Sequence, residues 1–167
     1  MHSTTTRITV TLIGLSMLGA APTPAAAQPP GRSIGFQYNL MTSGEVGQNL
    51  NGVAVDFDSP IFGDHLTLAG GGAFVTTTAS NATISQTFFG AGPGIRHDTG
   101  TLEVWAHALL GYRRDAGRIG RLSGGHSGFD GRFATGVDYP LNERYRLRAG
   151  VAYSGNTHVT LGLSTRW

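Results

Sequence analysis

Residues 144–167, RYRLRAGVAYSGNTHVTLGLSTRW, place a bulky apolar or aromatic side chain at almost every second position. The bulky parity consists of Tyr145, Leu147, Ala149, Val151 and Tyr153, followed by Val159, Leu161, Leu163, Thr165 and Trp167. The opposite parity holds arginine, glycine and small polar residues, beginning with Arg144, Arg146 and Arg148. A period of two is that of a β-strand, whose successive side chains point to opposite faces. The stretch therefore predicts two strands, 144–153 and 158–167.

The same alternation recurs upstream, and turn-forming residues interrupt it. Eight runs can be counted, at 33–40, 50–58, 65–76, 82–96, 101–113, 128–139, 144–153 and 158–167. The connections after the second, fourth and sixth runs are short, whereas those after the first, third and fifth are polar, and the fifth is the longest, at about 114–127. An even number of strands with short turns at one end is the layout of a transmembrane barrel. We predict an all-β, eight-stranded, antiparallel, up-and-down barrel.

Composition excludes several other classes. The 167 residues include 26 glycines, no cysteine and 13% charged residues, and all twelve basic residues are arginine. Disordered chains, coiled coils and disulfide scaffolds have different compositions. A formal charge of +2 gives little reason to expect a nucleic-acid partner.

Residues 1–27 differ from the rest of the chain. Arg7 precedes a short apolar stretch at 8–18, and Ala25, Ala26 and Ala27 precede Gln28. This pattern predicts a secretory signal peptide cleaved near Ala27/Gln28, which leaves residues 28–167 as one exported barrel domain.

The two faces of the strands differ in size as well as polarity. The charged face is otherwise rich in glycine and alanine, which suits the narrow lumen of an eight-stranded barrel. We therefore expect the charged face to point inward, where acids and arginines pair because unpaired buried charges are costly. The predicted lumen network comprises Asp56, Asp58, Arg96, Glu103, Asp130, Arg132, Asp138, Arg144, Arg146, Arg148 and Arg166. The apolar face would meet lipid, with aromatic residues near both of its edges.

The C-terminal stretch resembles the last strand of bacterial outer-membrane barrels, because it ends on an aromatic residue preceded by alternating apolar residues. Together with the turn at 136–141, GVDYPL, it makes the whole mature chain look like a small barrel of the OmpA-membrane-domain and OmpX type. The resemblance implies an outer-membrane location. It also implies that Leu161, Leu163 and Trp167 form the signal recognised by the barrel assembly machinery.

Residues that carry chemistry are few. His126 and Ser127 lie near Asp130, but neighbouring side chains on an extended chain point apart, so we expect no catalytic site. The histidines lack the spacing of metal ligands, and we expect neither metal nor cofactor. The polar segment at 114–127 and its flank hold Arg113, Arg114, Arg118 and Arg121. Because arginine binds phosphate with two hydrogen bonds, we hypothesise a contact with lipopolysaccharide phosphates.

The expected role is structural, membrane-stabilising or adhesive. It would be exercised through the barrel wall and the exposed loops, with the possibility of an extracellular surface ligand, and not through an open pore or catalysis. One alternative is an exported, soluble, lipocalin-like barrel that binds a small apolar ligand. A second alternative is an outer-membrane enzyme that modifies lipid A.

Overall fold

The computed structural model describes residues 31–43, 48–63, 65–79 and 82–167. The predicted signal peptide, 1–27, and its cleavage point near Ala27/Gln28 lie outside the described residues. Within the described part of the chain, no helix is long and apolar enough to cross a membrane.

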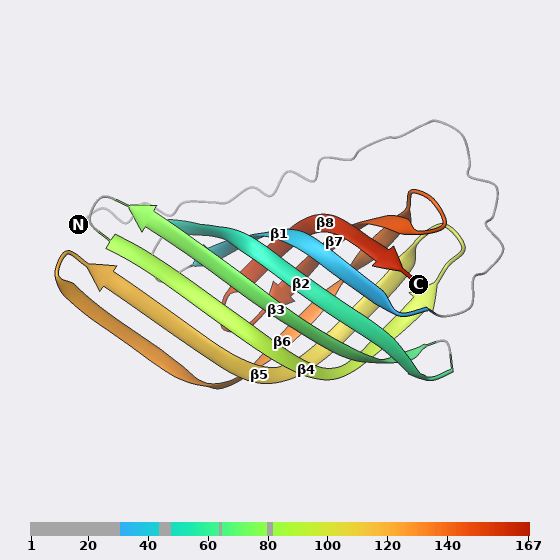
Figure 1. The fold of residues 1–167 in the computed structure, drawn as a ribbon, viewed down its shortest axis with the longest axis horizontal. Coiled ribbons are helices and arrows are strands. Elements are labelled where there is room, and N and C mark those ends of the chain that lie inside the picture. Colours follow the sequence, from blue (N-terminus) through green and yellow to red (C-terminus); the bar gives the residue numbers. More distant parts are fainter. Residues whose placement is uncertain (1–30, 44–47, 64, 80–81) are drawn as a thin grey trace, which may run out of the picture.

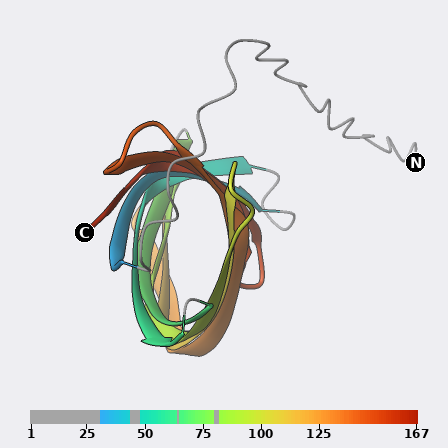
Figure 2. The ribbon, with the colours of Figure 1, turned by 90° about the vertical axis from the view of Figure 1, so that its right-hand side faces the viewer.

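Eight antiparallel strands form a closed barrel in which each strand pairs with its neighbours in the sequence (Figure 1). The strands are β1 (Ser33–Ser43), β2 (Gln48–Phe62), β3 (Leu66–Ala79), β4 (Ala82–Asp98), β5 (Glu103–Ile119), β6 (Leu122–Pro140), β7 (Tyr145–Tyr153) and β8 (Thr157–Arg166). The ring closes where β1 pairs with β8, from Ser33 opposite Arg166 to Thr42 opposite Thr157. Seen from one end, the strands surround a single axis (Figure 2). The prediction of an eight-stranded up-and-down barrel is confirmed.

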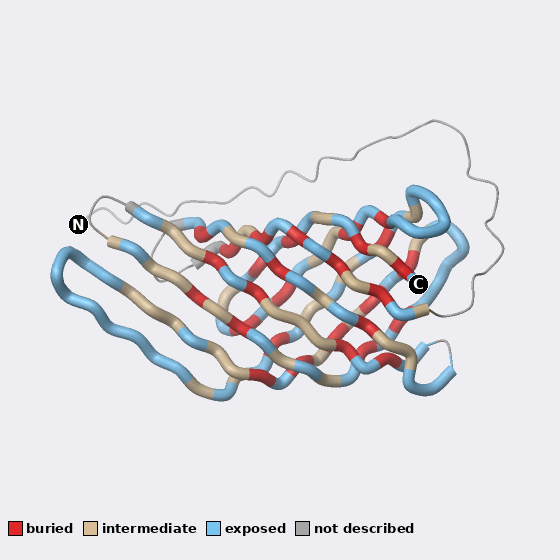
Figure 3. Tube along the Cα trace, in the orientation of Figure 1, coloured by how far each residue is buried: buried red, intermediate tan, exposed pale blue. Residues whose placement is uncertain are grey.

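Burial alternates along the strands (Figure 3). On β8, the side chains of Leu161 and Leu163 are exposed, whereas those of Thr160 and Ser164 are buried. On β7, Leu147 is exposed while Arg146 and Arg148 are buried. The bulky apolar face therefore lies outside the barrel, and most of the charged face lies inside it.

Glycine is required on the inner face where strands and lumen side chains crowd together. A Cβ atom on Gly136 would lie 2.2 Å from the carbonyl oxygen of Ala149 and 2.6 Å from Cζ2 of Trp105. On the outer face, a Cβ on Gly131 would meet no atom within 4 Å. The abundance of glycine thus allows bulky lumen side chains to fit against the wall.

The segment 114–127 is not a loop, and that prediction is wrong. Strands β5 and β6 stay in register from Glu103 opposite Asp138 to Ile119 opposite Leu122. The connection is a tight turn at Gly120, which adopts a φ of 59°, a conformation that favours glycine. Because neither hydrocarbon nor a packed core borders this part of the hairpin, its sequence lacks the apolar alternation that marks the other strands. The hairpin extends beyond the other strands at the left of Figure 1.

One edge of this hairpin has no neighbouring strand among the residues that the structure describes. The pairing of β6 with β7 begins only at Phe133, opposite Tyr153, and continues to Pro140. Residues 122–132 of β6 pair with β5 alone among the described strands. Backbone groups on the other side of this segment are therefore free to pair with a further strand.

Candidate functional site

The lumen contains a layer of charges near the short-turn end of the barrel. Glu103 on β5 lies at its centre: Arg96 Nε is 3.4 Å from Oε1, Arg146 Nη1 is 3.4 Å from Oε2, and Arg166 also contacts Oε2. Arg96 further bridges to Asp58 at 3.2 Å and donates a hydrogen bond to Ser33 Oγ at 2.7 Å. Strands from all around the ring are thereby tied together at this level.

A second layer is built around Arg148 on β7. Its Nε and Nη2 atoms each donate a 2.8 Å hydrogen bond to the carboxylate of Asp138, in a bidentate arrangement. The guanidinium carbon also lies 4.8 Å from the centre of the Trp105 ring, whose Nε1 donates to Asp138 Oδ1 at 3.1 Å. Asp56 lies 3.6 Å from Arg148 Nη1. Arg148 is fully buried, with 0% of its surface exposed.

These two layers balance in charge. Four carboxylates (Asp56, Asp58, Glu103, Asp138) pair with four arginines (Arg96, Arg146, Arg148, Arg166), so the charges of the two layers cancel, 4 − 4 = 0, with histidine neutral. Arg148 and Asp58 are completely buried at this level. The arrangement fills and ties the lumen.

The predicted lumen set needs three corrections. Arg144 is exposed in the turn before β7, because the Asn142 side chain accepts hydrogen bonds from the backbone N–H groups of Arg144 and Tyr145, and the strand begins only at Tyr145. Asp130 lies outside the two layers and pairs with Arg113 instead. Arg132 is buried, but no carboxylate among the described residues lies within ion-pair distance of it, and its guanidinium lies 5.7 Å from the Phe88 ring centre.

Uncharged side chains complete the lumen network. Ser164 donates to Asp138 at 3.1 Å, and His107 Nε2 lies 3.0 Å from Asp58. Two partners were missed from the sequence: Gln37, which donates to Asp56, and Trp105, which donates to Asp138. Both share the inward parity of their strands, so extending the alternation to uncharged residues would have found them.

A second cluster of charges lies at the loop end of the lumen, beyond the apolar band. Arg113 on β5 pairs with Asp115 at 2.8 Å and with Asp130 at 2.9 Å, and donates to the backbone oxygen of Ser154 at 2.8 Å. The hydrogen bond to Asp115 raises the pKa of Arg113 above its usual range, and that to Asp130 adds to the effect.

A hydrogen-bonded chain lies beside this cluster. Ser154 Oγ is 3.2 Å from His158 Nε2, and His158 Nδ1 is 3.3 Å from Asn39 Oδ1. All three side chains are buried, with at most 1% of their surface exposed. The chain joins the β7–β8 turn to β8 and to its neighbour β1 on one side of the lumen.

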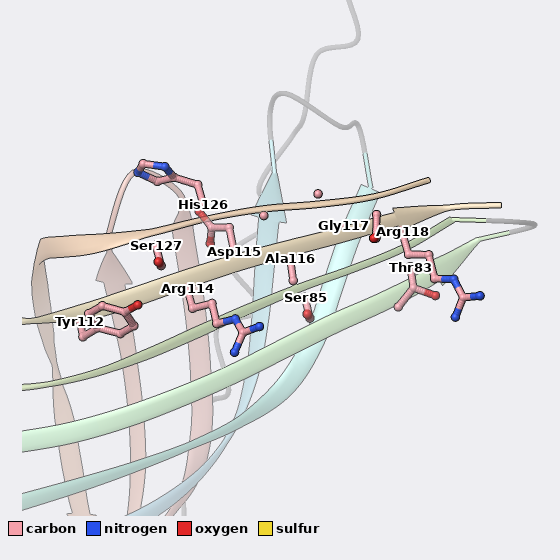
Figure 4. A pocket seen from close by; sticks show the side chains of 13 residues that line it. Thr83, Ser85, Tyr112, Arg114, Asp115, Ala116, Gly117, Arg118, His126 and Ser127 are labelled. Carbon is pink, nitrogen blue, oxygen red and sulfur yellow. The ribbon is translucent and has the colours of Figure 1, made fainter. Parts of the chain in front are cut away.

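His126 and Ser127 lie on opposite faces of β6. Their cross-strand partners are Asp115 and Arg114, respectively, and Figure 4 shows the two side chains pointing away from each other. The adjacent pair considered in the sequence is therefore not assembled into a site.

The four arginines of the proposed lipopolysaccharide contact are divided by the fold. Arg113 points inward into its ion pairs, whereas Arg114 and Arg118 leave the opposite face of β5 beside a surface hollow (Figure 4). The hollow has a volume of about 760 Å³ and is lined by residues of β4, β5 and β6, including Thr83, Ser85 and Ser127. Arg121 lies in the turn at the tip of the hairpin and does not line this hollow, so the hypothesised contact does not include it.

The residues of the predicted assembly signal lie on the outer surface. Leu161 and Leu163 are exposed along β8, and Trp167 follows the strand and is also exposed. The backbone N–H of Trp167 donates to the Arg32 carbonyl at 3.1 Å, which fixes the end of the chain against the start of the barrel.

Apolar outer face, charged lumen and eight-strand closure together define the class of small outer-membrane β-barrels. No family model matches the chain, and no curated protein matches it in sequence.

Solved structures share this fold. The attachment invasion locus protein Ail of Yersinia pestis aligns with a TM-score of 0.60 at 14% identity, over 82% of this chain and 97% of Ail. Neisserial surface protein A (NspA) aligns with a TM-score of 0.63 at 14% identity, over 81% of this chain and 96% of NspA. The N-terminal barrel of Pseudomonas aeruginosa OprF gives 0.58 at 13% identity, over 83% and 98% of the two chains.

Proposed function

We propose that this chain is an integral outer-membrane protein that acts as a rigid, closed anchor and presents the β5–β6 hairpin to an extracellular protein. The observation that carries this proposal is the free edge of β6 at 122–132, which pairs only with β5 among the described strands. Exposed strand edges bind extended segments of other proteins through backbone hydrogen bonds. The role is adhesive, and the lumen network stiffens the support.

The composition of the free edge favours such pairing. Residues 122–132 contain glycine and serine at most positions, with no proline or lysine to block an incoming strand. The name of one structural neighbour, the attachment invasion locus protein, is in keeping with an adhesive role. That neighbour has also been solved with the heparin analogue sucrose octasulfate.

A second copy in the same membrane is a poor occupant of this edge. Two copies inserted with the same orientation both direct β6 from the outside inward, so their edges cannot pair antiparallel. Parallel pairing is also disfavoured. The strands of such barrels are tilted by about 35–45°, so the β6 strands of two copies related by a rotation about the membrane normal would cross at an angle and not run side by side. The partner is therefore an extended segment of a different protein.

The closed lumen argues against a pore. Arg148 and Asp58 block the axis as fully buried, paired side chains. The expected behaviour in planar bilayers is an absence of stable single-channel conductance.

A soluble barrel that binds an apolar ligand is not supported. Such a barrel needs an apolar cavity, whereas the lumen of this chain holds arginines and carboxylates, and its outer surface carries exposed aromatic and aliphatic side chains. Enzymatic modification of lipid would need a nucleophile with its base on the outer face. Ser127 is on that face, but its histidine neighbour is not.

Adhesion can be tested with bacteria that lack other adhesins and express this chain. In one variant, residues 115–126 are replaced by Asn-Gly, a two-residue hairpin turn that fits between the paired residues Arg114 and Ser127. In a second variant, Gly124→Lys and Gly128→Lys charge the edge but keep the hairpin; added Cβ atoms there meet no close contact.

We expect wild-type cells to bind immobilised extracellular-matrix proteins or cultured epithelial cells, and both variants to lose that binding while retaining heat-modifiable migration. Undiminished binding by the shortened variant would exclude the hairpin as the adhesive element.

We further propose that the outer-membrane assembly machinery recognises Leu161, Leu163 and Trp167. Their exposure on one outward line of the last strand makes them accessible to such a partner.

A further inference from the structure

The outward side chains of β4, β5 and β6 form cross-strand rows, which change from apolar to polar between one row and the next. Each row contains one residue from each strand, in the register of the two pairings. From the membrane outward, the rows are Ala91–Leu110–Gly131, Phe89–Tyr112–Phe129, Thr87–Arg114–Ser127, Ser85–Ala116–Gly125 and Thr83–Arg118–Ser123. An apolar row and an aromatic row are thus followed by two rows in which an arginine lies between two hydroxyl residues, with the row Ser85–Ala116–Gly125 between them.

The aromatic row marks the level of the membrane interface. Tyr112 lies 5.7 Å from Phe89 and 6.4 Å from Phe129, measured between ring centres. Aromatic belts on outer-membrane barrels lie where hydrocarbon gives way to headgroups. Arg114, in the next row, therefore faces sideways into the headgroup layer of the outer leaflet.

The charges of Arg114 and Arg118 are uncompensated. Both are exposed, and within the described ranges no carboxylate lies within ion-pair distance of either; Arg118 Nε donates to the backbone oxygen of Gly120 at 3.3 Å. Arg113, next to Arg114 in the chain, is by contrast neutralised by Asp115 and Asp130 on the inner face. The fold thus separates a structural arginine from two that face an external ligand.

Hydroxyl groups flank both arginines. Thr87 and Ser127 are the cross-strand neighbours of Arg114, and Thr83 and Ser123 are those of Arg118. The hollow that these strands form is lined by both arginines, by three of these hydroxyl residues (Thr83, Ser123 and Ser127) and by Ser85 (Figure 4). Guanidinium groups bind phosphate, and hydroxyl groups hydrogen-bond to sugar hydroxyls.

We propose that this face binds the phosphorylated sugar headgroup of an outer-leaflet glycolipid, with one phosphate on Arg114 and a second on Arg118. The two arginines are four residues apart on one strand, which separates their Cα atoms by about 13 Å. That spacing fits a headgroup with a phosphate at each end of a sugar pair better than a single phosphate. The acyl chains of the same lipid would pack against Leu110 and the apolar row below.

The proposal is independent of adhesion by the β6 edge, since it concerns the face of the sheet and not its free backbone. It can be tested by titrating the purified, folded chain in detergent micelles with diphosphorylated lipid A, monophosphorylated lipid A, phosphatidylglycerol and soluble heparin. The variants are Arg114→Gln and Arg118→Gln. Arg121→Gln is the matched control, because it removes the same charge from the same hairpin without altering the rows.

We expect each of the two variants to weaken binding of diphosphorylated lipid A by about tenfold, as for the loss of a charge-assisted hydrogen bond, and Arg121→Gln to leave it unchanged. Binding of monophosphorylated lipid A should be weakened by only one of the two substitutions. Heat-modifiable migration of every variant verifies that the barrel is folded.

Three results would overturn the proposal. Equal binding of phosphatidylglycerol and lipid A would show attraction to any anionic lipid. Equal losses in all three variants would show a diffuse effect of hairpin charge. Heparin binding that depends on Arg114 and Arg118, without a corresponding effect on lipid A, would show that the face serves a soluble polyanion.

Discussion

Replacing Arg148 with methionine tests whether the lumen network holds the barrel together. Methionine retains much of the arginine stem but leaves Asp138 and Asp56 without their guanidinium partner. At the observed 2.8 Å separation and an effective dielectric constant of 20, the attraction to Asp138 is about 6 kcal/mol before desolvation is subtracted. Breaking one side of a buried pair costs about 3–5 kcal/mol in proteins. Because Trp105 and Ser164 still donate to Asp138, we expect a loss near the lower limit, about 3 kcal/mol.

The assay is urea unfolding of the protein refolded in phospholipid vesicles, followed by tryptophan fluorescence and by heat-modifiable migration. Adding Asp138→Asn to Arg148→Met removes both charges. The free energy of unfolding of the double variant should therefore fall by less than the sum of the decreases in the two single variants, with a coupling energy of about 2 kcal/mol.

Arg144→Met is the matched control. Arg144 has the same sequence parity as Arg148 but is exposed in the turn, so its replacement should change the unfolding free energy by no more than about 0.5 kcal/mol. Equal losses for Arg148→Met and Arg144→Met, or a loss below about 1 kcal/mol for Arg148→Met, would refute the view that the buried pair stabilises the barrel.

Three further perturbations address the wall, the membrane and assembly. Gly136→Ala should destabilise the barrel by about 1–3 kcal/mol in urea titrations because its Cβ collides with backbone, whereas Gly131→Ala should be neutral; equal effects would contradict the packing described for the lumen. Leu110→Arg, on the exposed outer face one row below the aromatic row, should cost about 1–2 kcal/mol in vesicles, between the values for the interface and the midplane, and a neutral result would place this face outside the hydrocarbon. Deleting Trp167 should reduce the fraction of assembled barrel in bacterial outer membranes, measured by heat-modifiable migration after fractionation, but leave refolding in detergent intact; unchanged assembly would remove this residue from the signal.

The strands could be predicted because lipid outside and a crowded lumen inside impose opposite side-chain sizes on alternate positions. Inside the apolar band, the sequence alternation at 144–153 and 158–167 corresponds closely to β7 and β8. Beyond the band, no hydrocarbon borders the hairpin. Its side chains are therefore not selected for alternating size, and serine and glycine are tolerated there. The pairing of residues 114–127 is maintained by backbone hydrogen bonds, which leave no periodic trace in the sequence.

The lumen network was predictable in composition but not in its partners. Parity identified Asp138 and Arg148 as inward residues, yet only the register places them side by side. Parity also failed where a strand ends: Arg144 continues the alternation of Arg146 but lies in a turn fixed by Asn142. The height of Asp130 above the two lumen layers depends on strand length, which the sequence of the hairpin did not reveal.

The ring closure beside Ser33 brings the two ends of the barrel into contact, with Trp167 hydrogen-bonded to Arg32. Joining these ends by a short linker and opening the chain at Gly120 would yield a circular permutant with every strand pair preserved. Such a molecule would carry Trp167 in the interior of its sequence and two new termini outside the cell. It would therefore show whether the barrel can fold when Trp167 is no longer at the C-terminus where the assembly machinery would recognise it. The new termini would also offer a fusion point on the cell surface.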